Sequence, residues 1–308
     1  MMKQQNNPLF GKIKKVGIAA PASLCRKEKL ESCAEIFRRA GVEPVFGENI
    51  SRKGKYSYLS ADDPFRIEDF NRFAADDSID AIFCARGGYG TPRILNDLNY
   101  ELLRERNLPV IGFSDITALH LAMLSRNAGI CVASRMAGEL DSVFHSPTTL
   151  AGMRRVYSML SCDDWEYRKT GRVLSSFGMP ENVSGGIIPL NLTLAAALCG
   201  TGFLPSLQEQ IIVLEEVGEP VRKIDRMLHQ LIYSSFFKGA AAVVFAQFTD
   251  CGKTSERKIL FRDFAEKTGI PVFYGLRYGH ELPSFSFLFG EPCKIENGNL
   301  FLGYIRNK

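Results

Sequence analysis

The chain has 308 residues, about twice the size of a typical domain, so its length favours two domains. Its composition, 45% hydrophobic and 23% charged, is that of a packed globular protein and excludes wholesale disorder, collagen and coiled coils. The net charge of +4 comes from scattered basic residues, so we expect no surface that follows a phosphate backbone and no nucleic-acid partner.

The cysteines and apolar segments indicate the compartment. Eight cysteines are spread along the chain without a Cys-x-x-Cys pair, which is not the pattern of a zinc site or a disulfide framework. A basic cluster before residues 16–25 resembles the start of a signal peptide, but Pro21 interrupts the uncharged run. The longest uncharged segment, 183–207, contains glycines and polar residues that would leave backbone groups unmet in lipid. We expect a cytoplasmic protein with no membrane span.

In the first half of the chain, short apolar runs alternate with helical segments. The predicted strands are 15–20, 42–46, 81–84 and 109–113, and the predicted helices are 30–40, 64–75, 91–98, 116–127 and 147–160. Because these strands are continuously apolar, we expect a parallel sheet covered on both faces, of the Rossmann or flavodoxin-like type.

The pattern loosens after residue 142, around the only tryptophan, and predicts a linker at 161–182. Beyond it, the predicted helices are 192–199, 222–236 and 255–267, and the predicted strands are 210–214, 240–245, 271–274, 285–290, 293–296 and 300–305, the last three short and antiparallel. The sequence therefore predicts an N-terminal α/β domain over 1–160 and a C-terminal α/β domain with a β-rich end over 183–308.

Ser114 stands between a predicted strand and a predicted helix. At such a turn its hydroxyl can protrude beside unpaired helix N–H groups, which is where a nucleophile is placed. The alternative is that Ser114 caps the helix, a role for which Asp115 competes. The lipase-type Gly-x-Ser-x-Gly pattern is absent, because Ile116 takes the place of the second glycine.

A serine nucleophile needs a base, and the chain has four histidines. His120, His145 and His229 lie in positions typical of packed or solvated side chains. His280 lies in a glycine-flanked loop after a predicted strand, as a catalytic group would.

Glu215 and Glu216 end an apolar strand, where a carboxylate is costly unless something pairs with it. One of them could orient the imidazole, and the alternation of the strand does not decide which. The alternative is an ion pair with Arg222 or Arg226.

The loop 86–90 reads Arg-Gly-Gly-Tyr-Gly and follows another predicted strand. Its flexible amides are suitable donors for an oxyanion hole. It lacks the Gly-x-Gly-x-x-Gly spacing and the Walker lysine, so the pattern does not favour a nucleotide site.

Taken together, five motifs resemble the LD-carboxypeptidase family of serine peptidases, which includes muramoyl-tetrapeptide carboxypeptidases and microcin self-immunity proteins. The resemblance spans nearly the whole chain. The motifs occur at 17–23, 85–90, 112–117, 214–219 with 224–228, and 279–280.

The resemblance implies a triad of Ser114, Glu215 and His280, without a metal or cofactor. It also implies an oxyanion hole from the backbone N–H groups of Gly88 and Asp115. The serine would lie on the N-terminal domain and the other two residues on the C-terminal one, with the site in the cleft between them. Homodimers are common in this family.

The implied activity is release of a terminal D-amino acid, D-alanine above all, from an L,D-peptide such as a murein tetrapeptide in peptidoglycan recycling. Arg86 is the candidate partner of the substrate carboxylate, with a structural ion pair as its alternative, and Gly87 and Tyr89 are further candidate contacts. The alternative functions are hydrolysis of a peptidyl-nucleotide antibiotic or non-catalytic binding of a small molecule.

Two segments depart from the family pattern. Ser-Arg-Met-Ala-Gly stands at 134–138 where His-Gly-Pro is usual, and four residues separate Gly185-Gly186 from Asn191-Leu192 where family members have Gly-Gly-Asn-Leu. Both segments are expected to shape the substrate cleft, so they bear on substrate identity more than on the triad.

Overall fold

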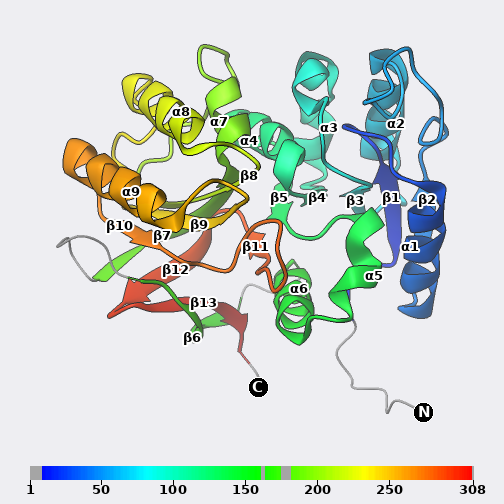
Figure 1. Ribbon diagram of the computed structural model, residues 1–308. Coiled ribbons are helices and arrows are strands. Elements are labelled where there is room, and N and C mark those ends of the chain that lie inside the picture. Colours follow the sequence, from blue (N-terminus) through cyan, green and yellow to red (C-terminus); the bar gives the residue numbers. More distant parts are fainter. Residues whose placement is uncertain (1–8, 161–163, 175–181, 307–308) are drawn as a thin grey trace.

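The computed structural model describes residues 9–160, 164–174 and 182–306, which form two lobes, each built on one sheet (Figure 1). Five parallel strands of the first sheet run in the order β2-β1-β3-β4-β5, the order of flavodoxin-like folds. Their bounds are β1 Lys15–Ala19, β2 Glu43–Phe46, β3 Ala81–Cys84, β4 Pro109–Gly112 and β5 Ile130–Ala133. The predicted parallel sheet is confirmed.

Helices cover both faces of this sheet because neighbouring strand residues point to opposite sides. In β3, Ala81 and Phe83 pack with α1, α5 and α6, whereas Ile82 and Cys84 pack with α2, α3 and α4. The helices are α1 Lys27–Arg39, α2 Asp63–Ala75, α3 Tyr100–Glu105, α4 Thr117–Ser125, α5 Leu140–Val143 and α6 Pro147–Met159, with 3-10 turns η1 Thr91–Arg93, η2 Leu95–Asp97, η3 Ser114–Ile116 and η4 Ala137–Glu139.

The second sheet is mixed and runs in the order β10-β9-β8-β7-β12-β13-β6. β10 to β7 are parallel and the last three strands antiparallel, as expected for an α/β domain with a β-rich end. The strands are β6 Trp165–Arg172, β7 Asn182–Asn191, β8 Gln210–Val217, β9 Ala242–Thr249, β10 Val272–Tyr274, β12 Glu291–Glu296 and β13 Asn299–Ile305. α7 Leu192–Ala197, α8 Val221–Tyr233 and α9 Thr254–Thr268 cover one face (Figure 1).

The structure corrects the predicted linker. Residues 165–172 form β6, which pairs with β13 at the edge of the second sheet, while 161–163 and 175–181 lie outside the described residues. Strands β5 and β7 and helices α3 and α5 were not predicted, and the predicted helix 91–98 is two 3-10 turns, η1 and η2. The segment 285–290 contributes β11 (Phe287–Leu288), which pairs antiparallel with β5 of the first sheet rather than with its neighbours in sequence.

The lobes share one apolar core, because buried residues of α4 and of α7 and α8 belong to the same cluster. The N–H of Asn191, at the end of β7, also donates to Thr117 Oγ1 at the start of α4, at 3.1 Å. The carboxyl ends of strands from the two sheets are thereby fixed against each other. Among the described residues, no helix has the length and hydropathy needed to span a membrane.

Candidate active site

Ser114 is the first residue of η3, at the sharp turn that follows β4. Its backbone has a φ of +62°, in the left-handed region that residues with a side chain rarely adopt. Phe113, not Ser114, occupies the cap position of η3, and the Ser114 hydroxyl makes no capping hydrogen bond there. The hydroxyl instead lies 3.1 Å from Nε2 of His280. The strained turn therefore aims this hydroxyl out of the sheet, and the capping alternative is wrong.

His280 lies in the loop that follows β10, in the other lobe. Its Nδ1 is 2.9 Å from Oε2 of Glu215, and its side chain is 25% exposed. When Nδ1–H donates to the carboxylate, the neutral ring leaves Nε2 free to accept the proton of Ser114. Serine, imidazole and carboxylate thus form one hydrogen-bonded chain across the two lobes.

Glu215 is completely buried at the end of β8. Its Oε1 accepts a hydrogen bond from Asn191 Nδ2 at 3.0 Å. The register of β8 against β9 shifts between Leu214 and Glu216, so a bulge lies at Glu215. A bulge re-aims side chains, which is why simple alternation could not separate the two adjacent glutamates.

Glu216 shares Asn191, whose Nδ2 lies 3.5 Å from its Oε1, but its other partners differ from those of Glu215. Its carboxylate accepts hydrogen bonds from Thr193 N at 2.8 Å, Thr193 Oγ1 at 2.7 Å and Val217 N at 2.8 Å. Thr193 lies in the first turn of α7, so this carboxylate satisfies a free N–H of that helix. The predicted alternative of an ion pair with Arg222 or Arg226 is not found in the described part of the chain, and Glu216 is a structural carboxylate.

The pKa values of His280 and Glu216 are both raised, but for different reasons. Burial disfavours the charged imidazole of His280, but the hydrogen bond and the charge of Glu215 outweigh it and raise the pKa above 6.5. Burial raises the pKa of Glu216, against which its hydrogen bonds with Thr193 and Val217 act only in part. The site therefore favours an imidazolium, the form that arises when His280 takes a proton.

The glycine loop 86–90 lies directly against the serine. A Cβ on Gly87 would stand 3.2 Å from Ser114 Oγ and 3.4 Å from Asp115 N. Gly88 has a φ of +102°, and a Cβ there would meet Ser23 Oγ at 2.4 Å. Only glycine fits at Gly88 without displacing Ser23, and at Gly87 the loop brings bare backbone next to the Ser114 hydroxyl.

The side chain of Asp115 serves the same loop. It is buried, and its carboxylate accepts a hydrogen bond from Thr91 N at 2.8 Å. Burial raises the pKa of this carboxyl, opposed by the hydrogen bonds from Thr91. The side chain thus anchors the end of the glycine loop, and the backbone N–H of Asp115 is left at the start of η3, where helix amides lack intrahelical partners.

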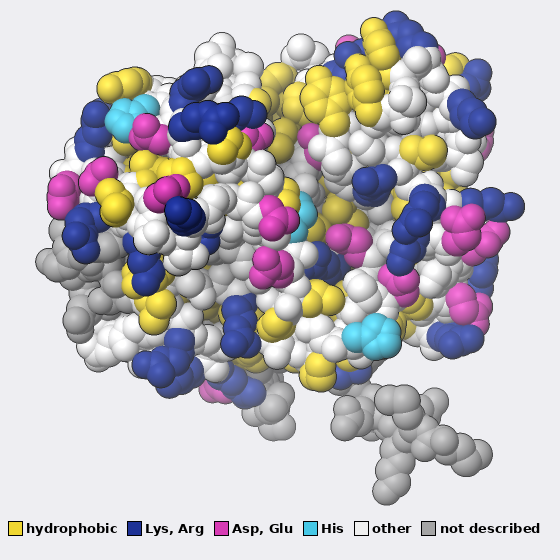
Figure 2. Space-filling model, in the orientation of Figure 1, with side chains coloured by type: hydrophobic (Ala, Val, Ile, Leu, Met, Phe, Trp, Pro, Cys, Tyr) yellow, Lys and Arg dark blue, Asp and Glu magenta, His cyan; other side chains and the backbone are white. Residues whose placement is uncertain are grey.

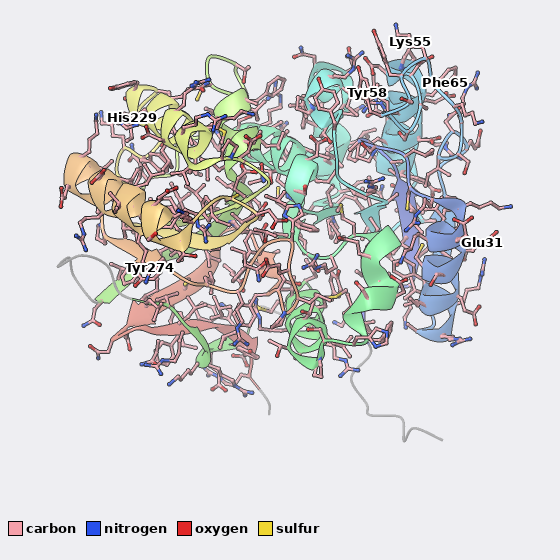
Figure 3. All side chains as sticks on the ribbon, viewed as in Figure 1. Glu31, Lys55, Tyr58, Phe65, His229 and Tyr274 are labelled. Carbon is pink, nitrogen blue, oxygen red and sulfur yellow. The ribbon has the colours of Figure 1, made fainter. Side chains whose placement is uncertain are left out.

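Arg86 and Tyr89 lie on the outer side of the loop. The exposed Arg86 donates to the carbonyl of Leu24 at 3.1 Å, and the alternative of a structural ion pair for it is not found among the described residues. Tyr89 is 54% exposed and stands edge-on to Tyr58, with ring centroids 5.4 Å apart. Tyr58 stacks in turn on Tyr56 at 5.2 Å, and Figure 3 shows Tyr58 near the top of the first lobe.

In the described part of the chain, the other three histidines make no hydrogen bond with Ser114 or Glu215. His120 is fully buried with Nε2 3.0 Å from the carbonyl of Val110, and burial lowers its pKa to about 4. His229 contacts Asp225 within α8, and His145 is exposed. Among the described residues, no group of three or more His, Cys, Asp and Glu side chains is arranged to hold a metal ion.

Sequence reasoning missed two polar residues that organise the site, Asn191 and Arg135. Asn191 belongs to the divergent segment 185–192, and its side chain also accepts from Leu194 N, so it joins the start of α7 to Glu215. Arg135 belongs to the other divergent segment, 134–138, and is buried beside the His280 loop. In the sequence, the only sign of either residue was that its segment departs from the family pattern.

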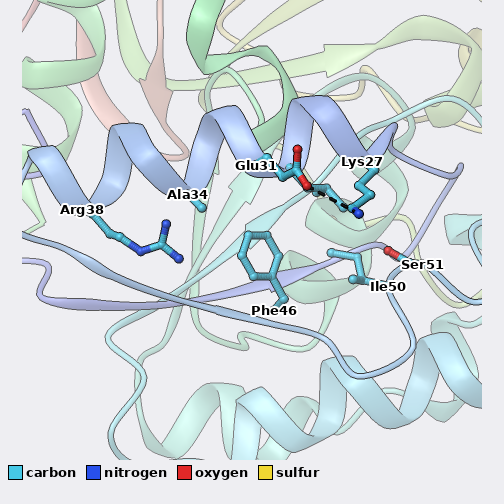
Figure 4. Close-up of a pocket in the computed structure, with 8 residues that line it drawn as sticks. Lys27, Glu31, Ala34, Arg38, Phe46, Ile50 and Ser51 are labelled. Carbon is cyan, nitrogen blue, oxygen red and sulfur yellow. Dashed lines mark ion pairs between the residues drawn. The ribbon is translucent and has the colours of Figure 1, made fainter.

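The surface is hollowed between the lobes, with acidic side chains and one histidine side chain visible in the hollow (Figure 2). A separate groove of about 330 Å³ lies between α1 and β2, with Leu30, Phe46 and Ile50 among its lining residues (Figure 4). Lys27 and Glu31 form an ion pair at its rim, at 3.6 Å. None of its lining residues belongs to the serine–histidine pair, so this groove is not the candidate active site.

Comparison with known proteins identifies the family. Residues 16–134 match the LD-carboxypeptidase N-terminal domain, and residues 184–295 match the LD-carboxypeptidase C-terminal domain. The chain is 30% identical over 295 residues to the murein tetrapeptide carboxypeptidase of Pseudomonas aeruginosa, covering 93% of this chain and 94% of that protein. It is 28% identical over 290 residues to the probable murein peptide carboxypeptidase of Bacillus subtilis, covering 91% and 88%.

Solved structures agree on the fold. The muramoyltetrapeptide carboxypeptidase of Oxalobacter formigenes superimposes with a TM-score of 0.80 at 22% identity, over 95% of this chain and 99% of that one. The MccF-like protein of Bacillus anthracis gives 0.82 at 18% identity, over 96% and 98%. These matches, with the two family domains and the curated relatives, confirm the resemblance noted in the sequence: the chain belongs to the LD-carboxypeptidase family and is a serine carboxypeptidase.

Proposed function

We propose that this carboxypeptidase releases the terminal D-alanine of a murein tetrapeptide, with Ser114 as nucleophile, His280 as general base and acid, and Glu215 as the group that orients the imidazole. The observation that carries the proposal is the hydrogen-bonded chain from Ser114 Oγ through the ring of His280 to Glu215 Oε2, at 3.1 and 2.9 Å. These distances are within direct proton-transfer reach.

The steps follow from this chain. Ser114 Oγ attacks the carbonyl carbon before the terminal residue while its proton passes to His280 Nε2. The imidazolium gives that proton to the departing amine, D-alanine leaves, and the truncated peptide remains as an ester on Ser114. Water then attacks the ester with His280 again as base, which restores the serine and leaves a carboxylate on the peptide.

The tetrahedral intermediates carry a negative oxygen that needs donors. We assign this role to the backbone N–H groups of Gly88 and Asp115. The support is that the bare backbone of Gly87 lies against Ser114 and Asp115 N, and that a helix start presents amides without intrahelical partners. Fixed backbone donors stabilise charge that develops only in the transition state.

Arg86, Gly87 and Tyr89 are proposed to contact the substrate. The leaving group is a single amino acid and extends no more than about 7 Å from the scissile bond. Protein residues farther than this from the bond can therefore contact only the longer acyl portion of the substrate. The exposed tyrosines at 56, 58 and 89 therefore suit the part of a muropeptide remote from D-alanine, and Arg86 suits a carboxylate.

We assign the reaction to peptidoglycan recycling in the cytoplasm, by a homodimer. The names of two relatives give murein peptides as what those proteins act on, which fits a recycling role for this chain. Seven cysteines in the described residues are free, and six of these are buried, which suits a reducing compartment. Sedimentation velocity of the purified protein tests the dimer, and a monomer at micromolar concentration would reject it.

The test is release of D-alanine from a free murein tetrapeptide by the wild-type protein and by Ser114→Ala. We expect release by the wild type and almost none by the variant, with matching circular dichroism spectra. Equal rates would remove Ser114 from the mechanism. A wild type that leaves the tetrapeptide intact but cleaves a peptidyl-nucleotide would replace the proposed substrate with the antibiotic type, and binding without cleavage of either would reject the hydrolase.

A further inference from the structure

Residues 134–139, which follow β5, contact the loops that carry the serine and the glycines. The N–H of Ser134 donates to the carbonyl of Gly112, just before the serine turn, at 3.2 Å. The N–H of Gly138 donates to the carbonyl of Ala85, just before the glycine loop, at 2.9 Å. This segment is therefore fixed to the first lobe at two points beside the candidate active site.

From this segment Arg135 reaches across to the second lobe. Its Nη2 donates to the carbonyls of Gly279 at 2.9 Å and Glu281 at 3.2 Å, and its Nη1 lies 3.4 Å from the carbonyl of His280. The guanidinium thus contacts three consecutive carbonyls of the histidine loop. Arg135 is only 6% exposed, so these contacts are made away from water, where hydrogen bonds are strong and unpaired groups are costly.

The aromatic ring of Phe113 completes the contact. The guanidinium of Arg135 lies 5.0 Å from the centroid of this ring, and the imidazole of His280 lies 5.1 Å from it. Glu139 accepts from Arg135 Nη1 at 3.4 Å and, through its other oxygen, from Met136 N at 3.1 Å. The arginine is therefore held in place from its own lobe while it holds the loop of the other.

We propose that Arg135 is a positioning residue that fixes the backbone of the His280 loop, and so sets the imidazole against Ser114 across the two lobes. The proposal rests on the proposed function, because it assigns no new reaction and acts through His280. It gives a specific role to the segment that departs from the family pattern.

Other contacts of the loop explain why Arg135 has this role. Gln247 ties the loop to its own lobe, since its side chain accepts from Glu281 N at 3.0 Å and donates to the carbonyl of Pro283 at 3.2 Å. Thr149 Oγ1 of the first lobe accepts from Ser284 N at 2.9 Å, four residues beyond the histidine. Arg135 adds a contact from the first lobe to the backbone carbonyls at and beside the histidine itself.

The decisive variants are Arg135→Met and Arg135→Lys. Methionine keeps much of the length but no donor, so the three carbonyls lose their partner and the imidazole is released. A displacement of about 1 Å costs on the order of 100-fold in rate, so we expect kcat to fall by about that factor with KM little changed. Lysine keeps the charge without the planar fork, so its kcat should lie between those of the wild type and Arg135→Met.

The pH profile adds a readout that a merely structural role would not move. Three charged groups act on the imidazole of His280: Glu215 and Glu139 raise its pKa, and Arg135 lowers it. Removing the arginine charge therefore shifts the acid limb of kcat/KM to higher pH in Arg135→Met. Arg135→Lys keeps a cation at this position and should show a smaller shift.

Arg155 provides the matched control. It is also a buried arginine that joins α6 to the carboxyl-terminal part of the chain, donating to the carbonyls of Ser286 at 2.8 Å and Gly303 at 3.0 Å and pairing with Glu291 at 2.9 Å. Arg155→Lys keeps the charge pair but loses part of the fork. It should lower the melting temperature and leave kcat per folded molecule and the acid limb unchanged.

The experiment measures kcat, KM and the pH profile on the tetrapeptide for all three variants, with folded fractions determined by thermal melting. A loss of kcat and a shifted acid limb in Arg135→Met, absent from Arg155→Lys, support the proposal. Wild-type kcat and an unchanged acid limb in folded Arg135→Met would overturn it. Ser114→Ala, measured in parallel, distinguishes a failure of the Arg135 proposal from a failure of the proposed function. If Ser114→Ala stays active, the proposed function itself has failed.

Discussion

Replacing Glu215 by glutamine tests the part of the site that the sequence left undecided. In the native protein Oε2 accepts from His280 Nδ1 and Oε1 accepts from Asn191 Nδ2. The amide of glutamine has only one oxygen, and Asn191 needs an acceptor. The glutamine NH2 then faces Nδ1 of His280, which stabilises the tautomer that carries its proton on Nε2 and cannot accept the proton of Ser114.

The size of the effect follows from charge as well. Two unit charges about 4 Å apart at an effective dielectric of about 20 attract by about 4 kcal/mol. The imidazole is 25% exposed, so screening reduces the benefit to about 3 kcal/mol, or about 100-fold in kcat. Because the tautomer change adds to this, we expect a loss of between about 100-fold and about 10,000-fold for Glu215→Gln.

Glu216→Gln is the internal control, one residue away and equally buried. Its carboxylate contacts Thr193 and Val217 rather than the imidazole, so glutamine weakens the start of α7. We expect a loss of about 1 to 3 kcal/mol in the free energy of unfolding and a change in kcat below about tenfold.

The assay is coupled detection of D-alanine from the tetrapeptide, with urea unfolding of both variants. If Glu216→Gln is slower than Glu215→Gln, the acid of the triad is Glu216 and the assignment to Glu215 is wrong. Wild-type rates for both would show that neither carboxylate supports the imidazole.

Three further predictions follow from the same geometry. Glu215 raises the pKa of His280 above 6.5, so kcat/KM should fall as the pH drops through a value above 6.5. The same pair stabilises the fold while the imidazole is charged. Its contribution to the free energy of unfolding, measured with urea, should be full below pH 6.5 and lost as the pH rises through the raised pKa. Gly87→Ala places a methyl group 3.2 Å from Ser114 Oγ and should lower kcat by about tenfold or more, measured on the tetrapeptide, with little change in melting temperature. Tyr58→Ala removes the ring that Tyr89 contacts and should raise KM for a sugar-bearing tetrapeptide more than for the free peptide; an equal effect on both would place the sugar elsewhere.

Much of the fold could be predicted because continuous apolar strands and amphipathic helices alternate. β3 and β4 match their predicted positions to within a residue, since four apolar residues in a row suit a strand buried on both faces. β7 was missed because glycines and a proline interrupt it, and β6 because its residues are mostly polar at the edge of a sheet. The pairing of β11 with β5 joins residues more than 150 positions apart, which no local pattern records.

The candidate site was predictable where backbone geometry determines it and not where tertiary contacts do. Ser114 and His280 follow strands, so their location at the carboxyl edge could be expected. The choice between Glu215 and Glu216 depends on a bulge set by β9, and the contact of Arg135 with the histidine loop depends on how the two lobes meet. Neither depends on neighbouring residues in the sequence.

Labelling with a fluorophosphonate, which reacts with activated serines, tests the central claim most directly. Peptide mapping should find one phosphonyl group on Ser114, labelling should slow sharply in His280→Ala, and D-alanine release should disappear in proportion to the label. A label on another residue, or a fully labelled enzyme that still releases D-alanine, would contradict the account.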